Sequence, residues 1–139
     1  IVIGGILFFS GCGSLASGML PKSYRIAPAC IAVVIVLYAH GLPRLLMLAS
    51  ALPTIARIAV LLLAIAPLAF CMGMPFPLGL SKLHQEDVPW AWGVNGCLSV
   101  IGAPVATIIA VEWGFSRVML FAAFAYCVAW LSLGFKRYA

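Results

Sequence analysis

The chain has 139 residues, of which 65% are hydrophobic and only 8% are charged, and its mean hydropathy is +1.21. A soluble domain carries about 25% charged residues, so this chain has too little polar surface to cover a water-soluble core of its own size. The net charge of +5 comes from eight Lys and Arg residues against three acids, but the basic residues stand singly or in pairs with no basic stripe among aromatics, which argues against nucleic-acid binding.

Long apolar stretches separate the charged residues. Each is close to the ~20 residues that a helix needs to cross a hydrocarbon core, and a charge in the middle of a bilayer is costly. The pattern therefore predicts an all-α integral membrane helix bundle of five transmembrane helices. We expect the spans at about 1–20, 26–40, 58–74, 90–111 and 118–135. The 139 residues form a single transmembrane domain in this interpretation, and we expect it to be part of a longer protein because the first residue is already apolar and is not Met.

The first span carries small residues at helical spacing. Ser10, Ser14 and Gly18 recur every fourth residue, and Gly13 with Ser17 makes a second such pair. Small residues at this spacing let two helix backbones approach closely in lipid. The pattern predicts helix packing rather than a ligand site.

The segment after the second span allows two interpretations. Pro43 and Pro53 each remove a helical hydrogen bond, and residues 44–52 between them are mostly apolar but too short to cross the core. We expect a short helix lying in the membrane interface, anchored by Arg44 and Arg57. A kinked extension of the second span is the alternative.

The third span contains Pro67, where we expect a kink. The prolines of Pro75-Phe76-Pro77 are expected to end the helix soon afterwards. The loop at 80–89 is the most polar part of the chain, but its His and two adjacent acids have no metal-specific spacing. We interpret it as a solvated connection.

The fourth span begins with Trp90 and Trp92 and is followed by Trp113, as expected of aromatic anchors in the membrane interface. Asn95 lies about one turn inside its start. An amide at that depth requires a partner, which is either a neighbouring helix or a substrate. Small residues form one face of this span and predict a second close-packed contact: Gly96, Ser99, Ala103, Ala106 and Ala110.

The charges also suggest an orientation. A tight turn at 112–117 holds Glu112 and Arg117, which we expect to pair at the surface. The loops at 21–25 and 80–89 and the C-terminus share one side with five Lys and Arg residues, including Lys136-Arg137, and the other side has three. The positive-inside rule then predicts a cytoplasmic C-terminus. We expect a multi-pass protein of the cell (inner) membrane.

Two strings carry a family resemblance: MGMPFPLGL at 72–80 and VPWAWGVNG at 88–96. They resemble the C-terminal membrane region of multi-pass spermidine-synthase-like proteins, in which an aminopropyltransferase-like fold is fused to transmembrane segments. Some members are fused to a major-facilitator-like bundle. The similarity extends from about Pro43 to Phe135 and includes Ala66-Pro67-Leu68.

The resemblance implies a polyamine-synthase-like parent protein but puts no catalytic residue in this chain. Gly4-Gly5 and Gly11-Cys12-Gly13 lie in a membrane span rather than after a strand, so they do not fit a nucleotide fingerprint. The five cysteines form no CxxC pair, and we expect neither a metal nor a cofactor. As substrate-binding candidates we name Asn95, Trp92 and Phe76, because aromatic faces and an amide suit an amine cation.

The predicted function is a membrane-embedded C-terminal domain that anchors a spermidine-synthase-like protein and assists transport of a polyamine-related substrate. The alternative is the C-terminal part of a major-facilitator-type secondary transporter, which proline-kinked helices and small-residue faces favour. A scaffold without a ligand is a third interpretation. The expected partners are the lipid bilayer and other transmembrane helices or a soluble domain of the same parent protein, and not nucleic acid.

Overall fold

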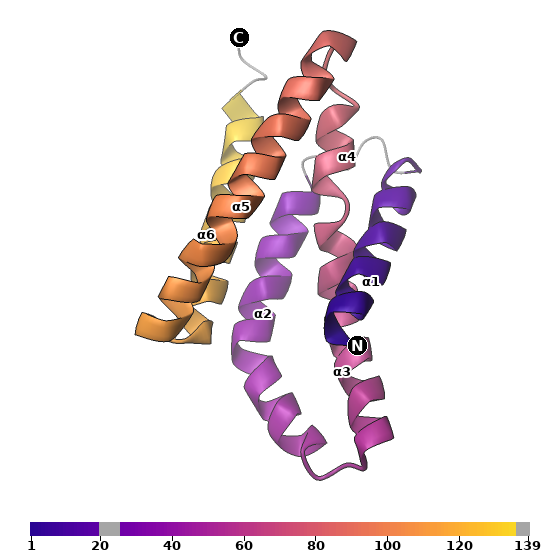
Figure 1. Ribbon diagram of the computed structural model, residues 1–139, viewed down its shortest axis with the longest axis vertical. Coiled ribbons are helices and arrows are strands. Elements are labelled where there is room, and N and C mark those ends of the chain that lie inside the picture. The colour runs from indigo at the N-terminus through magenta and orange to yellow at the C-terminus, as the bar shows by residue number, and fades with distance from the viewer. Residues whose placement is uncertain (20–25, 136–139) are drawn as a thin grey trace.

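The computed structural model describes residues 1–19 and 26–135, with side chains as far as Ser132. Within these residues the chain is entirely helical apart from turns, which confirms the all-α prediction (Figure 1). The elements are α1 (Val2–Ser17), α2 (Ile26–Ala49), α3 (Thr54–Met72), α4 (Pro75–Leu80), the 3-10 turn η1 (Gln85–Asp87), α5 (Val88–Trp113) and α6 (Phe115–Phe135). The polar turn expected at 21–25 and the Lys136-Arg137 anchor lie outside the described residues.

In residues 1–19 and 26–135, four helical segments are long and apolar enough to cross a membrane. They are Ile26–Ala49, Thr54–Leu80, Gln85–Trp113 and Phe115–Ser132. Helix α1 has 16 residues, so at 1.5 Å per residue it is about 24 Å long, against a hydrocarbon core of about 30 Å. It is shorter than the expected span at 1–20. These helices mark the chain as a membrane protein.

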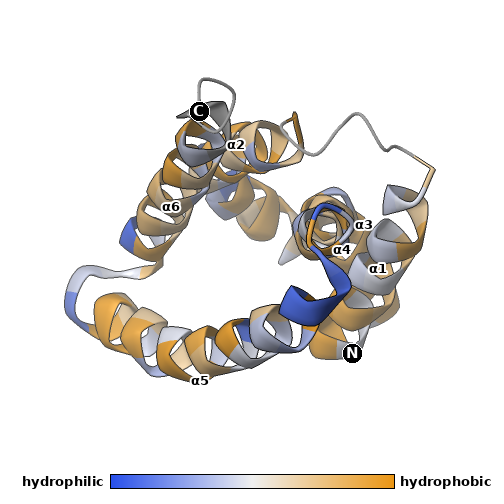
Figure 2. Ribbon diagram, turned by 90° about the horizontal axis from the view of Figure 1, so that it is seen from above, coloured by the Kyte–Doolittle hydropathy of each residue, from blue (hydrophilic) through white to orange (hydrophobic). Residues whose placement is uncertain are grey.

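The helices lie side by side in an order that differs from their order in the sequence. Helix α2 packs against both α3 and α6, α1 packs on the far side of α3, and α5 packs on α6. Figure 1 shows the helices roughly parallel to the long axis of the molecule. Seen from above in Figure 2, α5 lies apart from α2, and apolar colours dominate the long helices.

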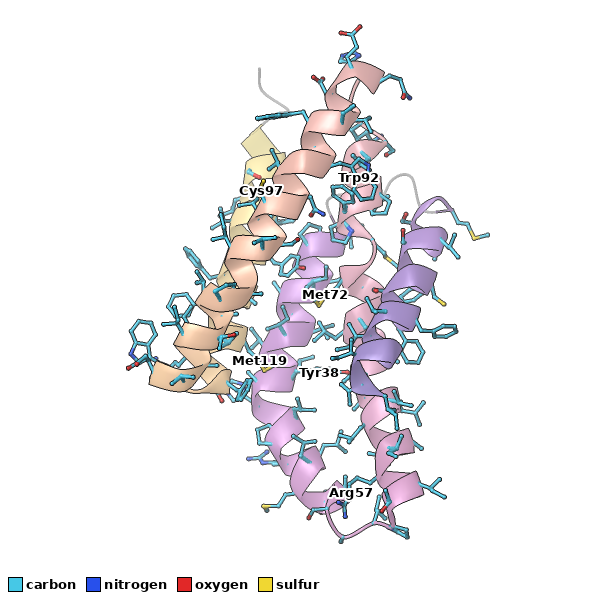
Figure 3. The ribbon with its side chains drawn as sticks, in the orientation of Figure 1. Tyr38, Arg57, Met72, Trp92, Cys97 and Met119 are labelled. Carbon is cyan, nitrogen blue, oxygen red and sulfur yellow. The ribbon has the colours of Figure 1, made fainter. Side chains whose placement is uncertain are left out.

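The most buried side chains lie on α2, as its central position requires. Ile31 is fully buried and packs with Ile35 and with Ala123 of α6, while Leu68 of α3 and Met119 of α6 border this cluster. Figure 3 shows Met119 between α6 and α2. Most other buried positions are small, which is typical of helices that associate within lipid: Gly13, Ser17, Ala27, Ala32, Ala49 and Ala69.

Helices α1 and α3 approach each other so closely that their contact leaves no room for a side chain at two glycines. A Cβ atom added to Gly13 would lie 2.8 Å from the carbonyl carbon of Phe70 and closer still to its oxygen. One added to Gly73 would meet the carbonyl group of Ser10 in the same way. Of the two predicted small-residue sets, the pair Gly13 and Ser17 is the buried one. This confirms close packing of the first helix.

The segment at 44–52 does not form a separate interfacial helix. Helix α2 continues through Pro43 to Ala49, so the alternative, an extended second helix, is correct. Pro43 removes only one hydrogen bond, and lipid offers the freed backbone no better partner outside the helix. Pro53 is the residue that separates α2 from α3, because its extended backbone (φ −55°, ψ 151°) precedes the first turn of α3.

Arg57 closes this turn instead of anchoring a surface helix. Its Nη2 donates to the carbonyl oxygens of Ser50 at 2.6 Å and Leu52 at 3.1 Å. Figure 3 shows Arg57 at the turn between α2 and α3. A guanidinium at the C-terminal end of a helix satisfies carbonyls that have no intrahelical partner.

The Pro75-Phe76-Pro77 string follows the end of α3, as predicted, but it begins a second, short helix. Helix α3 ends at Met72, and α4 begins at Pro75. The first four N–H groups of a helix have no intrahelical partner, so prolines at its first and third positions cost little there. The predicted end of the third helix is therefore confirmed, and the short helix α4 after it was not predicted.

Candidate functional site

Phe76 and Trp92 form an edge-to-face ring pair that joins α4 to α5. Their ring centroids lie 4.8 Å apart, and their planes meet at 83°. Phe76 is the second residue of α4, and Trp92 is the fifth residue of α5, so the turn through η1 brings the two strings together in space. Figure 3 shows Trp92 between α5 and α4. Two of the three predicted site residues are thus in contact.

Asn95 lies one turn beyond Trp92 on the same side of α5, because residues three apart in a helix are neighbours. Its side chain is exposed. Its backbone oxygen accepts a hydrogen bond of 2.7 Å from Ser99 Oγ, but its side-chain amide has no hydrogen-bond partner in the part of the chain that the structure describes. The neighbouring helix expected to satisfy this amide is not among the described elements.

Two acids precede Trp92 and Asn95 in the chain. Glu86 and Asp87 are exposed in η1, which leads directly into α5. Figure 2 shows the connection between α4 and α5 as the main hydrophilic segment in that view. We define the α4–α5 corner as Phe76, Glu86, Asp87, Trp92 and Asn95. It offers aromatic faces, an unused amide and two carboxylates at one end of the bundle.

The small-residue face of α5 is open, contrary to the predicted close packing. Gly96, Ser99 and Ala103 are exposed, and a Cβ added to Gly96 would meet nothing within 4 Å. Only Ala106 and Ala110, near the turn to α6, are half-buried. The spacing shows that a backbone can approach this face, but no described helix does.

The described residues contain no cluster of metal-binding side chains. No three His, Cys, Asp or Glu side chains of residues 1–19 and 26–135 lie close enough together to hold a metal ion. All five cysteines are free thiols. Glu112 and Arg117 do not form the expected surface pair, and neither makes any ion pair or hydrogen bond with the described side chains.

One half-buried polar link between helices was not predicted. The hydroxyl of Tyr38 donates to the carbonyl oxygen of Ala64, which joins α2 to α3. Tyr38 was expected at the end of the second span, but it lies in the middle of α2 because that helix continues to Ala49. A tyrosine inside an apolar helix generally finds a hydrogen-bond partner. This rule is the one feature of the sequence that could have indicated the link.

A second feature without a sequence signal lies at the turn between α5 and α6. The rings of Trp113 and Phe121 stack with centroids 6.1 Å apart and planes 24° from parallel. Beside them lies a groove of about 480 Å³ lined by Trp113, Arg117 and Phe121. A neighbouring groove of about 340 Å³ is lined by Arg117, Leu120, Phe121 and Phe124.

Comparison with known proteins found no match, either to a family model, to a curated protein or to a solved structure. The spermidine-synthase-like resemblance therefore rests on the two strings at 72–80 and 88–96.

Proposed function

We propose that the chain is the membrane-embedded domain of a spermidine-synthase-like protein of the cell's inner membrane, with its C-terminus in the cytoplasm. The observation that carries the proposal is the contact between Phe76 and Trp92. The two strings that carry the resemblance are separated in sequence, yet this contact joins them into one structural unit. The domain anchors its parent protein through its four long apolar helices.

The α4–α5 corner suits a polyamine better than any other described group of side chains. An amine cation over an aromatic face gains about 0.5–1 kcal/mol at an exposed site, and the carboxylates of Glu86 and Asp87 add attraction for a polycation. Phe76 is half-buried and the other groups are exposed, so each contact contributes little, and the expected dissociation constant is about 1 mM or weaker. Such weak binding suits a site that collects an amine near the membrane and releases it again.

Fluorescence of a protein with one tryptophan tests this function. All tryptophans except Trp92 are replaced by Phe, and the purified protein in detergent is titrated with spermidine. Saturable quenching is expected, and Glu86→Gln with Asp87→Asn should weaken it several-fold. Magnesium chloride at matched ionic strength is the control for charge alone. Quenching that magnesium reproduces, or that the double variant leaves unchanged, contradicts amine recognition at this corner.

The second candidate function is the C-terminal part of a major-facilitator-type transporter. The break between α3 and α4 favours it, because interrupted membrane helices are typical of transporter binding sites. Among the described residues, however, charged side chains are exposed and lie near helix ends, so no coupling acid lies within a span. Uptake of radiolabelled spermidine into vesicles that contain the parent protein distinguishes the anchoring function from the transporter function. Anchoring predicts no uptake driven by an ion gradient, and a transporter predicts gradient-dependent uptake.

A further inference from the structure

The turn between α5 and α6 has a fixed geometry that positions the first residues of α6. Gly114 has φ +83° and ψ 160°, which an L side chain rarely adopts. Its N–H donates to the carbonyl oxygen of Ala110 at 3.0 Å, and its carbonyl oxygen accepts from the N–H of Arg117 at 3.1 Å. Helix α6 then starts at Phe115. Arg117 is therefore held in the first turn of α6, where this helix pair ends.

Arg117 is a cation without a side-chain partner among the described residues. Its side chain is exposed and forms no ion pair or hydrogen bond with any described residue, Glu112 included. In a membrane protein the end of a spanning helix lies at the depth of the lipid headgroups. A guanidinium is well suited to a phosphate, because its planar array of donors matches the phosphate oxygens. The N-terminal turn of α6 also favours an anion.

The surface leading inward from Arg117 is apolar and hollowed. The two grooves at this turn share Arg117 and Phe121. Apart from Arg117, their lining side chains are all apolar: Trp113, Leu120, Phe121 and Phe124. Because residues 117, 121 and 124 lie on successive turns of one helix face, the hollow runs from the end of α6 towards its middle. The stacked Trp113 ring stands at the headgroup end.

We propose that this surface binds one membrane glycerophospholipid. Its phosphate lies on Arg117, and one acyl chain follows the groove along Leu120, Phe121 and Phe124. A free phosphate would use the guanidinium but none of the apolar groove, so the two features together indicate a lipid. The proposal does not depend on the polyamine function, because the two sites lie at opposite ends of α5.

Glu112 provides a second test of the proposal, because its charge is opposite to that of Arg117. Its carboxylate lies one residue before Trp113 and, like Arg117, has no partner among the described side chains. It is the acid nearest in sequence to Arg117, so its charge opposes an anionic headgroup. Glu112→Gln should strengthen binding of an anionic lipid, whereas Arg117→Gln should weaken it.

Native mass spectrometry of the delipidated protein in detergent measures this directly, with phosphatidylglycerol as the probe. One lipid should bind with saturation. Arg117→Gln should weaken it about tenfold, as expected for loss of a charge-assisted hydrogen bond. The matched control is Arg44→Gln, because Arg44 is also exposed and lines none of these grooves; it should bind like the unmodified protein.

Two further ligands separate the sources of affinity. Diacylglycerol, which lacks the phosphate, and inorganic phosphate, which lacks the chains, should each bind much more weakly than phosphatidylglycerol. Equal binding of phosphatidylglycerol by the Arg117→Gln and Arg44→Gln variants overturns the proposal, as does equal binding of diacylglycerol. If Arg117→Gln loses helicity by circular dichroism, Glu112→Gln decides the matter, since unchanged or weaker binding by that variant also overturns it.

Discussion

Helices α1 and α5 carry similar rows of small residues but meet different surroundings. On α1, Gly13 lies so close to α3 that a single added carbon would overlap the backbone of Phe70. On α5, Gly96 has nothing near it within 4 Å. A small-residue row therefore permits close approach without ensuring it, and the partner helix decides whether the row stabilises the fold. This contrast predicts how strongly substitutions in different parts of the bundle should lower its stability.

Gly13→Leu should have the largest effect. The atoms opposite Gly13 belong to the backbone of Phe70 and cannot rotate away, so we expect a loss of about 3 kcal/mol in the free energy of unfolding, at the upper end of overpacking costs. Unfolding by sodium dodecyl sulfate in mixed micelles, followed by circular dichroism, measures it. Gly4→Leu on the same helix is the control, because Gly4 has open space around it. Equal losses for the two variants contradict the close α1–α3 contact.

Ile31→Ala should come second. Ile31 is fully buried between α2 and α6, and its truncation leaves a cavity. Replacement of buried Ile by Ala in water costs about 2–5 kcal/mol. In lipid the separated helices remain in an apolar solvent, so the free energy of transfer from water no longer contributes to this cost. We therefore expect a loss of about 2 kcal/mol in the free energy of unfolding. Val33→Ala on the exposed side of α2 should change stability far less. The same assay checks both variants, and a Val33 effect as large as that of Ile31 would show that α2 is oriented differently.

Tyr38→Phe should have a smaller effect, because it removes only the hydroxyl that joins α2 to the carbonyl of Ala64. Side-chain hydrogen bonds between membrane helices contribute about 0.6 kcal/mol on average. Hydrogen exchange of the amides flanking Ala64 should speed up by a few-fold, as measured by mass spectrometry. The matched control is Tyr126→Phe, since Tyr126 packs against the core without a hydroxyl hydrogen bond to the described residues. Faster exchange in the control alone would count against the Tyr38 link.

Gly96→Leu should have the smallest effect of the four. With open space at Gly96, the larger side chain adds apolar surface to a face already exposed to lipid, and the change in unfolding free energy should stay within about 0.5 kcal/mol. The detergent unfolding assay described above is sensitive enough to detect a larger change. A loss comparable to that of Gly13→Leu would mean that another helix covers α5 in the protein as purified.

The positions of the helices follow from the sequence because charges are excluded from the hydrocarbon core. This rule placed α3, α5 and α6 near their observed positions. It did not place the end of α2, because Pro43 was treated as a helix breaker, although a single proline is tolerated where lipid offers the backbone no alternative partner. The same misjudgement at Pro75 hid the short helix α4.

The candidate site was predictable only in part. Helical spacing alone places Trp92 and Asn95 on one face of α5. That Phe76 meets Trp92 depends on the path of the chain through η1, which local patterns do not specify. The grooves at Arg117 were missed for a similar reason. They depend on which face of α6 is left uncovered by α2, and this is a tertiary property.

The central claim, that α5 crosses a membrane with its sides in lipid, is tested most directly by labelling Cys97. This thiol is exposed along the middle part of α5 (Figure 3). In intact membranes, a variant with Cys97 as its only cysteine should resist a sulfonated maleimide that is restricted to water, and it should react fully once the membrane is dissolved in sodium dodecyl sulfate. A cysteine placed in η1 by Gln85→Cys should react when the reagent reaches that side of the membrane. Rapid labelling of Cys97 in intact membranes would contradict the claim.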